Sequence, residues 1–322
     1  MTRIAVFLAL ALCTVLPAFA QEAARLPHVG VLNINTAANN EPFATMLREA
    51  LAALGDIDGQ NIRLDFRLAE GDARRFPQLA EALVRDHPTV IVAHGPPALR
   101  AAQHATQTIP IVASVNDLVA SGFIESMARP GGNITGVSMM SPELDAKRLE
   151  VLKEILPSAR RFGLLMETGT RAPGVLQPML DRARALGVAL QNIEVSAPAD
   201  LPGAVASFRA GDVQGVNVLS SVLLFNFHKE LGPLLLAGKL PAICEWKEMA
   251  ASGCLASYGT TLRELFAMQA ALIDKMLKGV PPGDTPAQQP TRFELVVNLK
   301  TAAALGLTVP PSILARADEV IE

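Results

Sequence analysis

Aromatic residues are scarce in this chain of 322 residues, which has one tryptophan, one tyrosine and 4% aromatic residues in all. Half of the residues are nevertheless hydrophobic. A sizeable core must therefore consist mainly of Ala, Val, Leu and Ile, a composition that suits helices packed on a β-sheet. The length allows one large α/β domain or two ordinary ones.

An excess of positive charge is also missing. The chain has 28 Lys and Arg against 31 Asp and Glu, which gives a formal net charge of −3, and it has no block of like charge. A protein that binds nucleic acid needs a basic face. We therefore predict that nucleic acid is not a partner.

Sequence motifs of catalysis and of cofactor binding are absent. There is no G-x-G-x-x-G or G-x-x-x-x-G-K-[ST] for a nucleotide and no G-x-S-x-G for a nucleophile. The five histidines show no metal-ligand spacing, and the cysteines do not form a C-x-x-C pair. We expect no metal, no cofactor and no enzymatic activity.

Long hydrophobic runs are confined to the N-terminus. Arg3 is followed by the uncharged run Ile4–Leu16 and by Ala18-Phe19-Ala20. A basic start, a short apolar segment and an A-x-A site are typical of a secretory signal peptide, here residues 1–20 with cleavage after Ala20. The alternative is a membrane anchor, but the run is shorter than the roughly 20 apolar residues of a spanning helix. We expect a soluble protein exported to the periplasm.

Apolar strands that alternate with helices make up the first half of the chain. In the stretch 89–117, Thr89–Ala93 and Ile109–Val115 are β-branched runs on either side of a helical segment. Continuous apolar strands separated by helices indicate a parallel sheet buried on both faces. The other strands predicted in this half are His28–Ile34, Asn61–Leu68 and Asn133–Ser138, and a helix is predicted over Val119–Ala128.

The second half repeats this architecture. Its predicted strands are Arg161–Met166, Val188–Val195, Val213–Ser221, Leu240–Cys244 and Cys254–Tyr258. We predict two doubly wound α/β lobes with a ligand cleft between them. Lobe one covers residues 27–138 and the helix 261–279, and lobe two covers residues 143–258. The proline-rich segment 279–290 is predicted to be a rigid linker to the tail 291–322, which we assign to lobe two.

Polar residues gather at the carboxyl ends of the predicted strands, where open α/β sheets bind ligands. These candidate ligand-binding residues are Asn33, Asn35, His94, Ser114, Asn116, Asp117, Glu167, Ser220, Ser221, Glu245 and Tyr258. Their amide, hydroxyl and carboxyl groups suit hydrogen bonds to a small polar solute, and an acid can pair with an ammonium group.

Each candidate has an alternative structural role. His94 precedes Gly-Pro-Pro and fits a turn equally well, and Asn116-Asp117 fits the cap of the following helix. Tyr258 is either a wall of the cleft or a core aromatic residue. Trp246 is interpreted as a rim residue.

Cys244 and Cys254 remain after removal of the signal peptide. In an oxidising compartment they can form a disulfide, and the alternative is a pair of buried thiols.

Several segments resemble one known family. They are AHGPPAL at 93–99, QTIPIV at 107–112, ARPGGNITGVS at 128–138, RLEVLKEILP at 148–157, LASYG at 255–259 and the tail from 288 to 322. The chain is similar to the bacterial ABC-transporter substrate-binding proteins of the tryptophan/tyrosine-binding-like group, which have a type I periplasmic-binding-protein arrangement.

The resemblance implies two lobes joined by three hinge strands that close on a solute. It also implies delivery to an inner-membrane permease driven by a cytoplasmic ATPase. His94, Ser114, Asn116, Asp117 and Tyr258 match the family's cleft loops. We expect a monomeric solute-binding receptor of an ABC importer, with an amino acid as a candidate solute. The alternatives are a periplasmic sensor module that signals to a receptor and a periplasmic enzyme with a two-lobed cleft.

Overall fold

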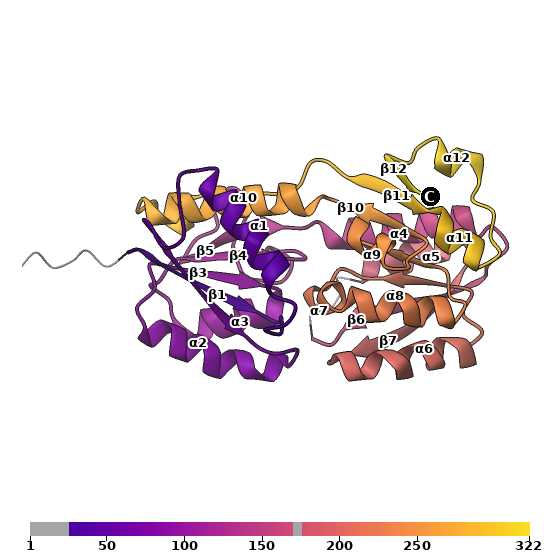
Figure 1. Cartoon of the computed structure of the whole chain (residues 1–322), viewed down its shortest axis with the longest axis horizontal. Coiled ribbons are helices and arrows are strands. Elements are labelled where there is room, and N and C mark those ends of the chain that lie inside the picture. The colour runs from indigo at the N-terminus through magenta and orange to yellow at the C-terminus, as the bar shows by residue number, and fades with distance from the viewer. Residues whose placement is uncertain (1–25, 170–175) are drawn as a thin grey trace, which may run out of the picture.

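The computed structural model describes residues 26–169 and 176–322 (Figure 1). The predicted signal peptide lies outside these residues. Within them, no helix has the length and the apolar character needed to span a membrane.

A five-stranded parallel sheet forms the centre of lobe one, in the order β2-β1-β3-β4-β5. Its strands are β1 His28–Asn33, β2 Arg63–Leu68, β3 Val90–His94, β4 Ile111–Val115 and β5 Ile134–Ser138. All residues of β1, β3, β4 and β5 are buried, whereas those of the edge strand β2 are half-buried or exposed. Coverage of both faces explains the continuous apolar runs of the inner strands.

Helices from two distant parts of the chain cover this sheet. They are α1 Glu41–Ala52, α2 Phe76–Arg85, α3 Pro96–Ala105 and α10 Leu262–Leu277, with a 3₁₀ turn at Ala73–Arg75. Helix α10 packs against α1 and against β3, β4 and β5, so a late segment of the chain completes lobe one (Figure 1).

A seven-stranded sheet forms lobe two, in the order β12-β11-β10-β9-β8-β6-β7. The strands are β6 Arg161–Glu167, β7 Ala189–Val195, β8 Gly215–Val218, β9 Ala242–Cys244, β10 Ala256–Gly259, β11 Glu294–Asn298 and β12 Glu319–Ile321. Its neighbouring strands are parallel except for the antiparallel pair β10 and β11.

The helices of lobe two lie on both faces of this sheet (Figure 1). They are α4 Ser141–Ile155, α5 Gln177–Ala185, α6 Leu201–Ala210, α7 Val222–Asn226, α8 His228–Ala237, α9 Lys247–Ala251, α11 Leu299–Ala304 and α12 Pro311–Leu314, with a 3₁₀ turn at Pro198–Asp200. The fold is therefore the expected pair of α/β lobes.

The chain crosses between the lobes after β5, after β10 and before β11. The proline-rich segment, which includes a 3₁₀ turn at Pro282–Asp284, runs along lobe one before its crossing. There, Gln288 exchanges backbone hydrogen bonds with Gly136 and Ser138, at 2.8 and 2.9 Å. The linker is therefore hydrogen-bonded to the outer edge of strand β5.

The helix predicted over Val119–Ala128 is wrong. The Asp117 carboxylate accepts hydrogen bonds from the amides of Val119 and Ala120, at 3.0 and 2.9 Å, and the chain then turns at Gly122 with φ +72°. An aspartate that binds backbone amides competes with helix formation, and glycine adopts positive φ at little cost.

Candidate functional site

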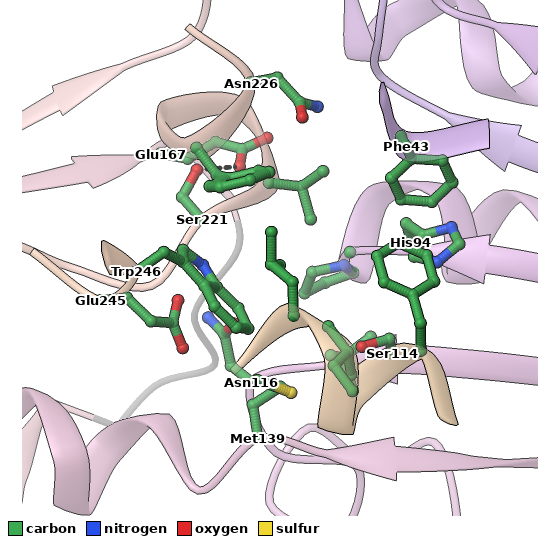
Figure 2. Close-up of a pocket in the computed structure, with 18 residues that line it drawn as sticks. Phe43, His94, Ser114, Asn116, Met139, Glu167, Ser221, Asn226, Glu245 and Trp246 are labelled. Atoms are coloured by element: carbon green, nitrogen blue, oxygen red, sulfur yellow. Dashed lines mark hydrogen bonds between the residues drawn. The ribbon is translucent and has the colours of Figure 1, made fainter. Parts of the chain in front are cut away.

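A pocket lies between the two lobes, beyond the carboxyl ends of β3, β4 and β6 (Figure 2). The space that a water-sized sphere can occupy within it is about 70 Å³. The labelled residues that line it are Phe43, His94, Ser114, Asn116, Met139, Glu167, Ser221, Asn226, Glu245 and Trp246.

The wall from lobe one is largely aromatic and aliphatic. The ring of Phe43 packs edge-on against His94, with centroids 4.5 Å apart, and against Phe266 of α10 at 5.0 Å. Leu262 and Leu265 of α10 continue this surface. Edge-to-face rings prefer such separations, so this wall is a packed apolar surface for a ligand.

His94 contributes no charge to this wall at neutral pH. Its Nε2 lies 3.0 Å from the Oε1 of Gln269, which accepts the hydrogen bond, so Nε2 carries the proton. Burial lowers the pKa of His94 to about 4, and the hydrogen bond to Gln269 opposes this shift only in part.

The wall from lobe two carries carboxyl groups beside aromatic rings (Figure 2). Glu167 ends β6 and Glu245 follows β9, with 7% and 5% of their surfaces exposed. Ser221 donates to Glu167 Oε2 at 2.6 Å and accepts from the amide of Leu224, which caps α7. Trp246 packs at an angle against Phe225, with centroids 5.8 Å apart.

Hydrogen bonds join the lobes around the pocket. Asn116 Nδ2 donates to the Ser220 carbonyl at 3.3 Å, and Asn39 Nδ2 donates to the Asn226 carbonyl at 3.2 Å. Arg100 donates to the Gly169 carbonyl at 2.6 Å. The structure therefore has its lobes in direct contact.

A buried arginine lies behind the wall of lobe two. Arg148 on α4 is 0% exposed and donates to Asp145, to Ser220 Oγ at 2.9 Å and to the Tyr258 carbonyl at 2.7 Å. These bonds connect α4, the loop after β8 and the strand β10 that leads to the other lobe. Arg148 thus holds together elements that meet at the pocket and at the crossing.

Six predicted site residues line the pocket: His94, Ser114, Asn116, Glu167, Ser221 and Glu245. The other five do not line it. Asn33 and Asn35 bond within their own loop, where Asn35 Nδ2 donates to Asn40 Oδ1 at 3.2 Å. Asp117 makes the turn described above and caps no helix, because the helix predicted after it is absent.

Ser220 and Tyr258 contact the protein rather than the pocket. Ser220 Oγ accepts from Arg148, and the ring of Tyr258 lies 6.1 Å from that of Phe293. Whether any of the predicted site residues binds ligand stays a prediction.

Sequence reasoning missed the aromatic part of the pocket. Phe43 and Phe266 are not among the predicted site residues, and Trp246, which we interpreted as a rim residue, lines the pocket and is 6% exposed. The one sequence signal for these residues is the small number of aromatic residues in the chain, which makes each of them a candidate for a specific role. Four of them line this pocket.

Cys244 and Cys254 form a disulfide next to the pocket, and both are buried. Among the described residues, no group of His, Cys, Asp and Glu is arranged to hold a metal ion.

Comparison with known proteins identifies the family. The family described as ABC transporter substrate binding protein matches residues 34–321. The chain is 28% identical, over 261 residues, to the tyrosine-binding protein of Clostridioides difficile strain R20291, which covers 80% of this chain and 75% of that protein.

Two solved structures share the fold. A conserved domain protein of Vibrio cholerae superimposes with a TM-score of 0.84 at 26% identity, covering 92% of this chain and 100% of the other. An ABC domain from Streptococcus pneumonia, solved in complex with L-Trp, gives a TM-score of 0.82 at 24% identity, covering 92% and 100%. The chain belongs to the ABC transporter substrate-binding proteins and has the two-lobed fold of type I periplasmic binding proteins.

Proposed function

We propose that this protein is the exported receptor of an ABC importer, that it captures an amino acid with an apolar side chain, and that it delivers this solute to a membrane permease. The observation that carries the proposal is the buried pocket between the lobes, with carboxyl groups on one wall and aromatic rings on both.

The two walls suit different parts of one ligand. Glu167 and Glu245 would accept hydrogen bonds from the ligand's ammonium group. Phe43 and Phe266 would pack against its side chain. The names of the tyrosine-binding relative and of the L-Trp complex support an aromatic amino acid.

Aromatic residues are scarce in the chain as a whole, and a scarcity of aromatic contacts would disfavour an aromatic ligand. Phe43, Phe225, Phe266 and Trp246 nevertheless all line the pocket, as one ring pair on each wall. This concentration supports an aromatic or large aliphatic side chain.

Closure of the lobes is the proposed mechanism. A ligand that touches both walls interacts more strongly with the closed form than with the open form, and so shifts the equilibrium towards closure. The hydrogen bonds from Asn39, Asn116 and Arg100 to the opposite lobe would add to the closed form. Closure also creates a continuous surface across both lobes, which a permease can distinguish from the open form.

Export is part of the proposal. Cleavage after Ala20 would release a mature chain of residues 21–322 into the periplasm, where the importer collects its solute. The N-terminal sequence of the protein recovered from the periplasmic fraction checks this step.

Thermal-shift measurements on residues 21–322, followed by calorimetry, test the proposal. A panel of amino acids, purines, small carboxylates and sugars is compared, since a ligand that binds only the folded state raises the melting temperature. We expect L-tyrosine or L-tryptophan to give the largest shift. Replacing both Glu167 and Glu245 by Gln should weaken binding at least about tenfold, because the ammonium group loses its charged partners.

The matched control is Glu81→Gln, which changes an exposed glutamate on α2 and should leave affinity unchanged. Absence of any amino-acid hit, or equal affinity of the doubly substituted protein and the wild type, would contradict the proposal.

A further inference from the structure

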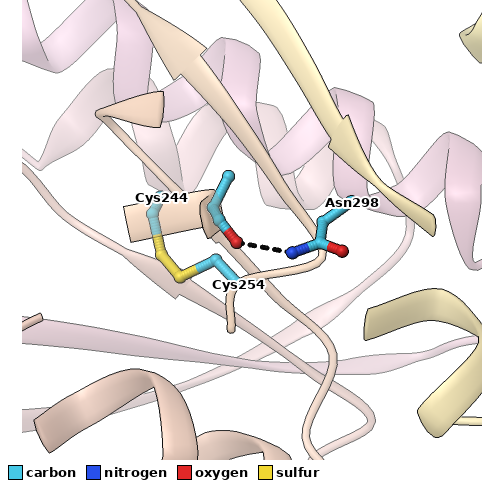
Figure 3. The surroundings of a disulfide bond; sticks show 4 residues. Cys244, Cys254 and Asn298 are labelled. Carbon is cyan, nitrogen blue, oxygen red and sulfur yellow. Dashed lines mark hydrogen bonds between the residues drawn. A yellow bond between two sulfur atoms is a disulfide. The ribbon is translucent and has the colours of Figure 1, made fainter. Parts of the chain in front are cut away.

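The disulfide Cys244–Cys254 closes the loop that carries two lining residues (Figure 3). Cys244 is the last residue of β9, and Glu245 and Trp246 follow it directly. Cys254 comes shortly before β10, which pairs in parallel with β9. The connection between these neighbouring strands is thus short, with α9 as its one helix, and its two ends are covalently joined.

The far end of this loop is anchored by other contacts. Asn298 Nδ2 donates to the Ala250 carbonyl at 2.8 Å (Figure 3). The backbone of Gly232 approaches the Ser252 carbonyl so closely that a Cβ at Gly232 would lie 1.9 Å from that oxygen. These contacts fix α9 and the residues after it. Trp246 is joined to α9, because its carbonyl accepts hydrogen bonds from the amides of Met249 and Ala250 at 3.0 and 3.2 Å.

The near end is held by the disulfide at Cys244 and by the close approach of the Gly259 backbone to the Glu245 carbonyl oxygen. Pairing of β9 with β10 stops at Cys244, so Glu245 and Trp246 lie beyond the sheet. The sulfur bond holds the Cα atoms of the two cysteines 6.4 Å apart and therefore limits how far this backbone can move away from the entrance of β10. Both cysteines are buried, at 0% and 1% exposure, in a packed environment.

We propose that the Cys244–Cys254 disulfide positions Glu245 and Trp246 for ligand binding, so that the affinity of the pocket depends on the oxidation state of this pair. The inference rests on the proposed function, in which these two residues contact the solute. Reduction by a phosphine such as TCEP breaks the S–S bond, gives two thiols with protons from water, and oxidises the phosphine to its oxide.

The test compares the oxidised wild type, residues 21–322, with the double variant Cys244→Ala/Cys254→Ala, using L-tyrosine as the probe in calorimetry. We expect the variant to fold and its Kd to rise about tenfold. Trp246 is the only tryptophan of the chain, so its fluorescence reports on this loop alone. Without ligand, its quenching by acrylamide should increase in the variant.

The matched control is Phe208→Leu, which alters the core of lobe two beneath β6 and lowers the melting temperature without touching the loop. Its Kd and its Trp246 quenching should equal those of the wild type. Unchanged Kd and quenching in the double variant, or an equal loss of affinity in the control, would overturn the positioning role.

Two further outcomes are informative. If the wild type does not bind L-tyrosine, the proposed ligand class fails. The acrylamide quenching of Trp246 without ligand then still tests the disulfide: increased quenching in the double variant supports the positioning role, and unchanged quenching contradicts it. If the double variant does not fold, wild type reduced with TCEP and verified by alkylation and mass spectrometry takes its place, with the same expected changes.

Discussion

Burial determines how His94 responds to pH. The imidazole is 6% exposed and donates to Gln269, and its surroundings favour the neutral form. In the unfolded chain the same group has its ordinary pKa of about 6.5 and takes up a proton more readily.

His94 should therefore make the protein less stable in mild acid. The pKa of His94 falls to about 4 in the folded state, so below the unfolded pKa the unfolded chain binds a proton more readily than the folded chain does. The contribution of neutral His94 to the unfolding free energy is therefore complete above the unfolded pKa and is lost as the pH falls towards 4. The loss in unfolding free energy between pH 7 and pH 5 is about 2 kcal/mol. Urea unfolding at pH 7 and pH 5 measures this loss. The unfolding free energy of His94→Gln should fall between these pH values by about 2 kcal/mol less than that of the wild type. Equal losses would contradict a buried neutral His94.

Arg148 is the opposite case, a buried charged group that forms an ion pair with Asp145. Replacing it by Met removes the charge that faces Asp145 and the donors to Ser220 and the Tyr258 carbonyl. Breaking a buried ion pair on one side costs about 3–5 kcal/mol. Chemical unfolding should show this loss for Arg148→Met. Combining it with Asp145→Asn should recover part of the stability, and no recovery would argue against the ion pair as the cause.

At the scale of elements, the end of strand β10, where the chain leaves lobe two, packs closely against the backbone of the pocket residue Glu245. Gly259 ends β10, and a Cβ added there would lie 2.4 Å from the Glu245 carbonyl oxygen. Only a residue without a side chain permits this approach.

Gly259→Ala should therefore destabilise the protein by about 1–3 kcal/mol, because the backbone of Glu245 has to move. Gly203→Ala is the matched control, since Gly203 lies in α6 with nothing within 4 Å of an added Cβ. Alanine favours the helix by about 0.5–1 kcal/mol, so this variant should be more stable. Urea unfolding of both variants checks the opposite signs, and a neutral Gly259→Ala would contradict the close approach.

Elements buried on both faces were the most predictable. The runs in β3 and β4 are apolar throughout because helices cover both sides of the sheet, and the sequence alone indicated them correctly. The apolar residues of the segment 119–128 have helical spacing, but the segment forms turns instead of a helix. The side chain of Asp117 and the positive φ of Gly122 decide otherwise, and neither effect appears in a periodicity.

At the scale of the whole molecule, the proposed closure would draw on the hydrogen bonds between the lobes. Asn39 and Arg100 donate across the interface without lining the pocket. They can therefore alter closure without altering the contacts to a ligand.

Replacing Asn39 by Ala together with Arg100 by Met should weaken ligand binding about tenfold, since each hydrogen bond contributes about 0.5–1.5 kcal/mol to the closed form. Small-angle scattering should show a larger radius of gyration without ligand and convergence with the wild type at saturation. Arg85→Met, at an exposed position of α2, is the control and should change neither quantity. An unchanged affinity would contradict closure as the mechanism.

The sequence by itself determined the two α/β lobes, because buried strands and amphipathic helices leave periodic patterns that depend only on local geometry. It also identified polar strand ends, among them His94, Glu167 and Glu245, because parallel strands bring their carboxyl ends to one edge. Only the tertiary structure separated Asn35, Asp117 and Tyr258, which bond or pack within the protein, from the residues that face the pocket. Only the tertiary structure also brought Phe43 and Phe266 together, since a helix stripe shows that a side chain is covered but not whether another helix or a ligand covers it.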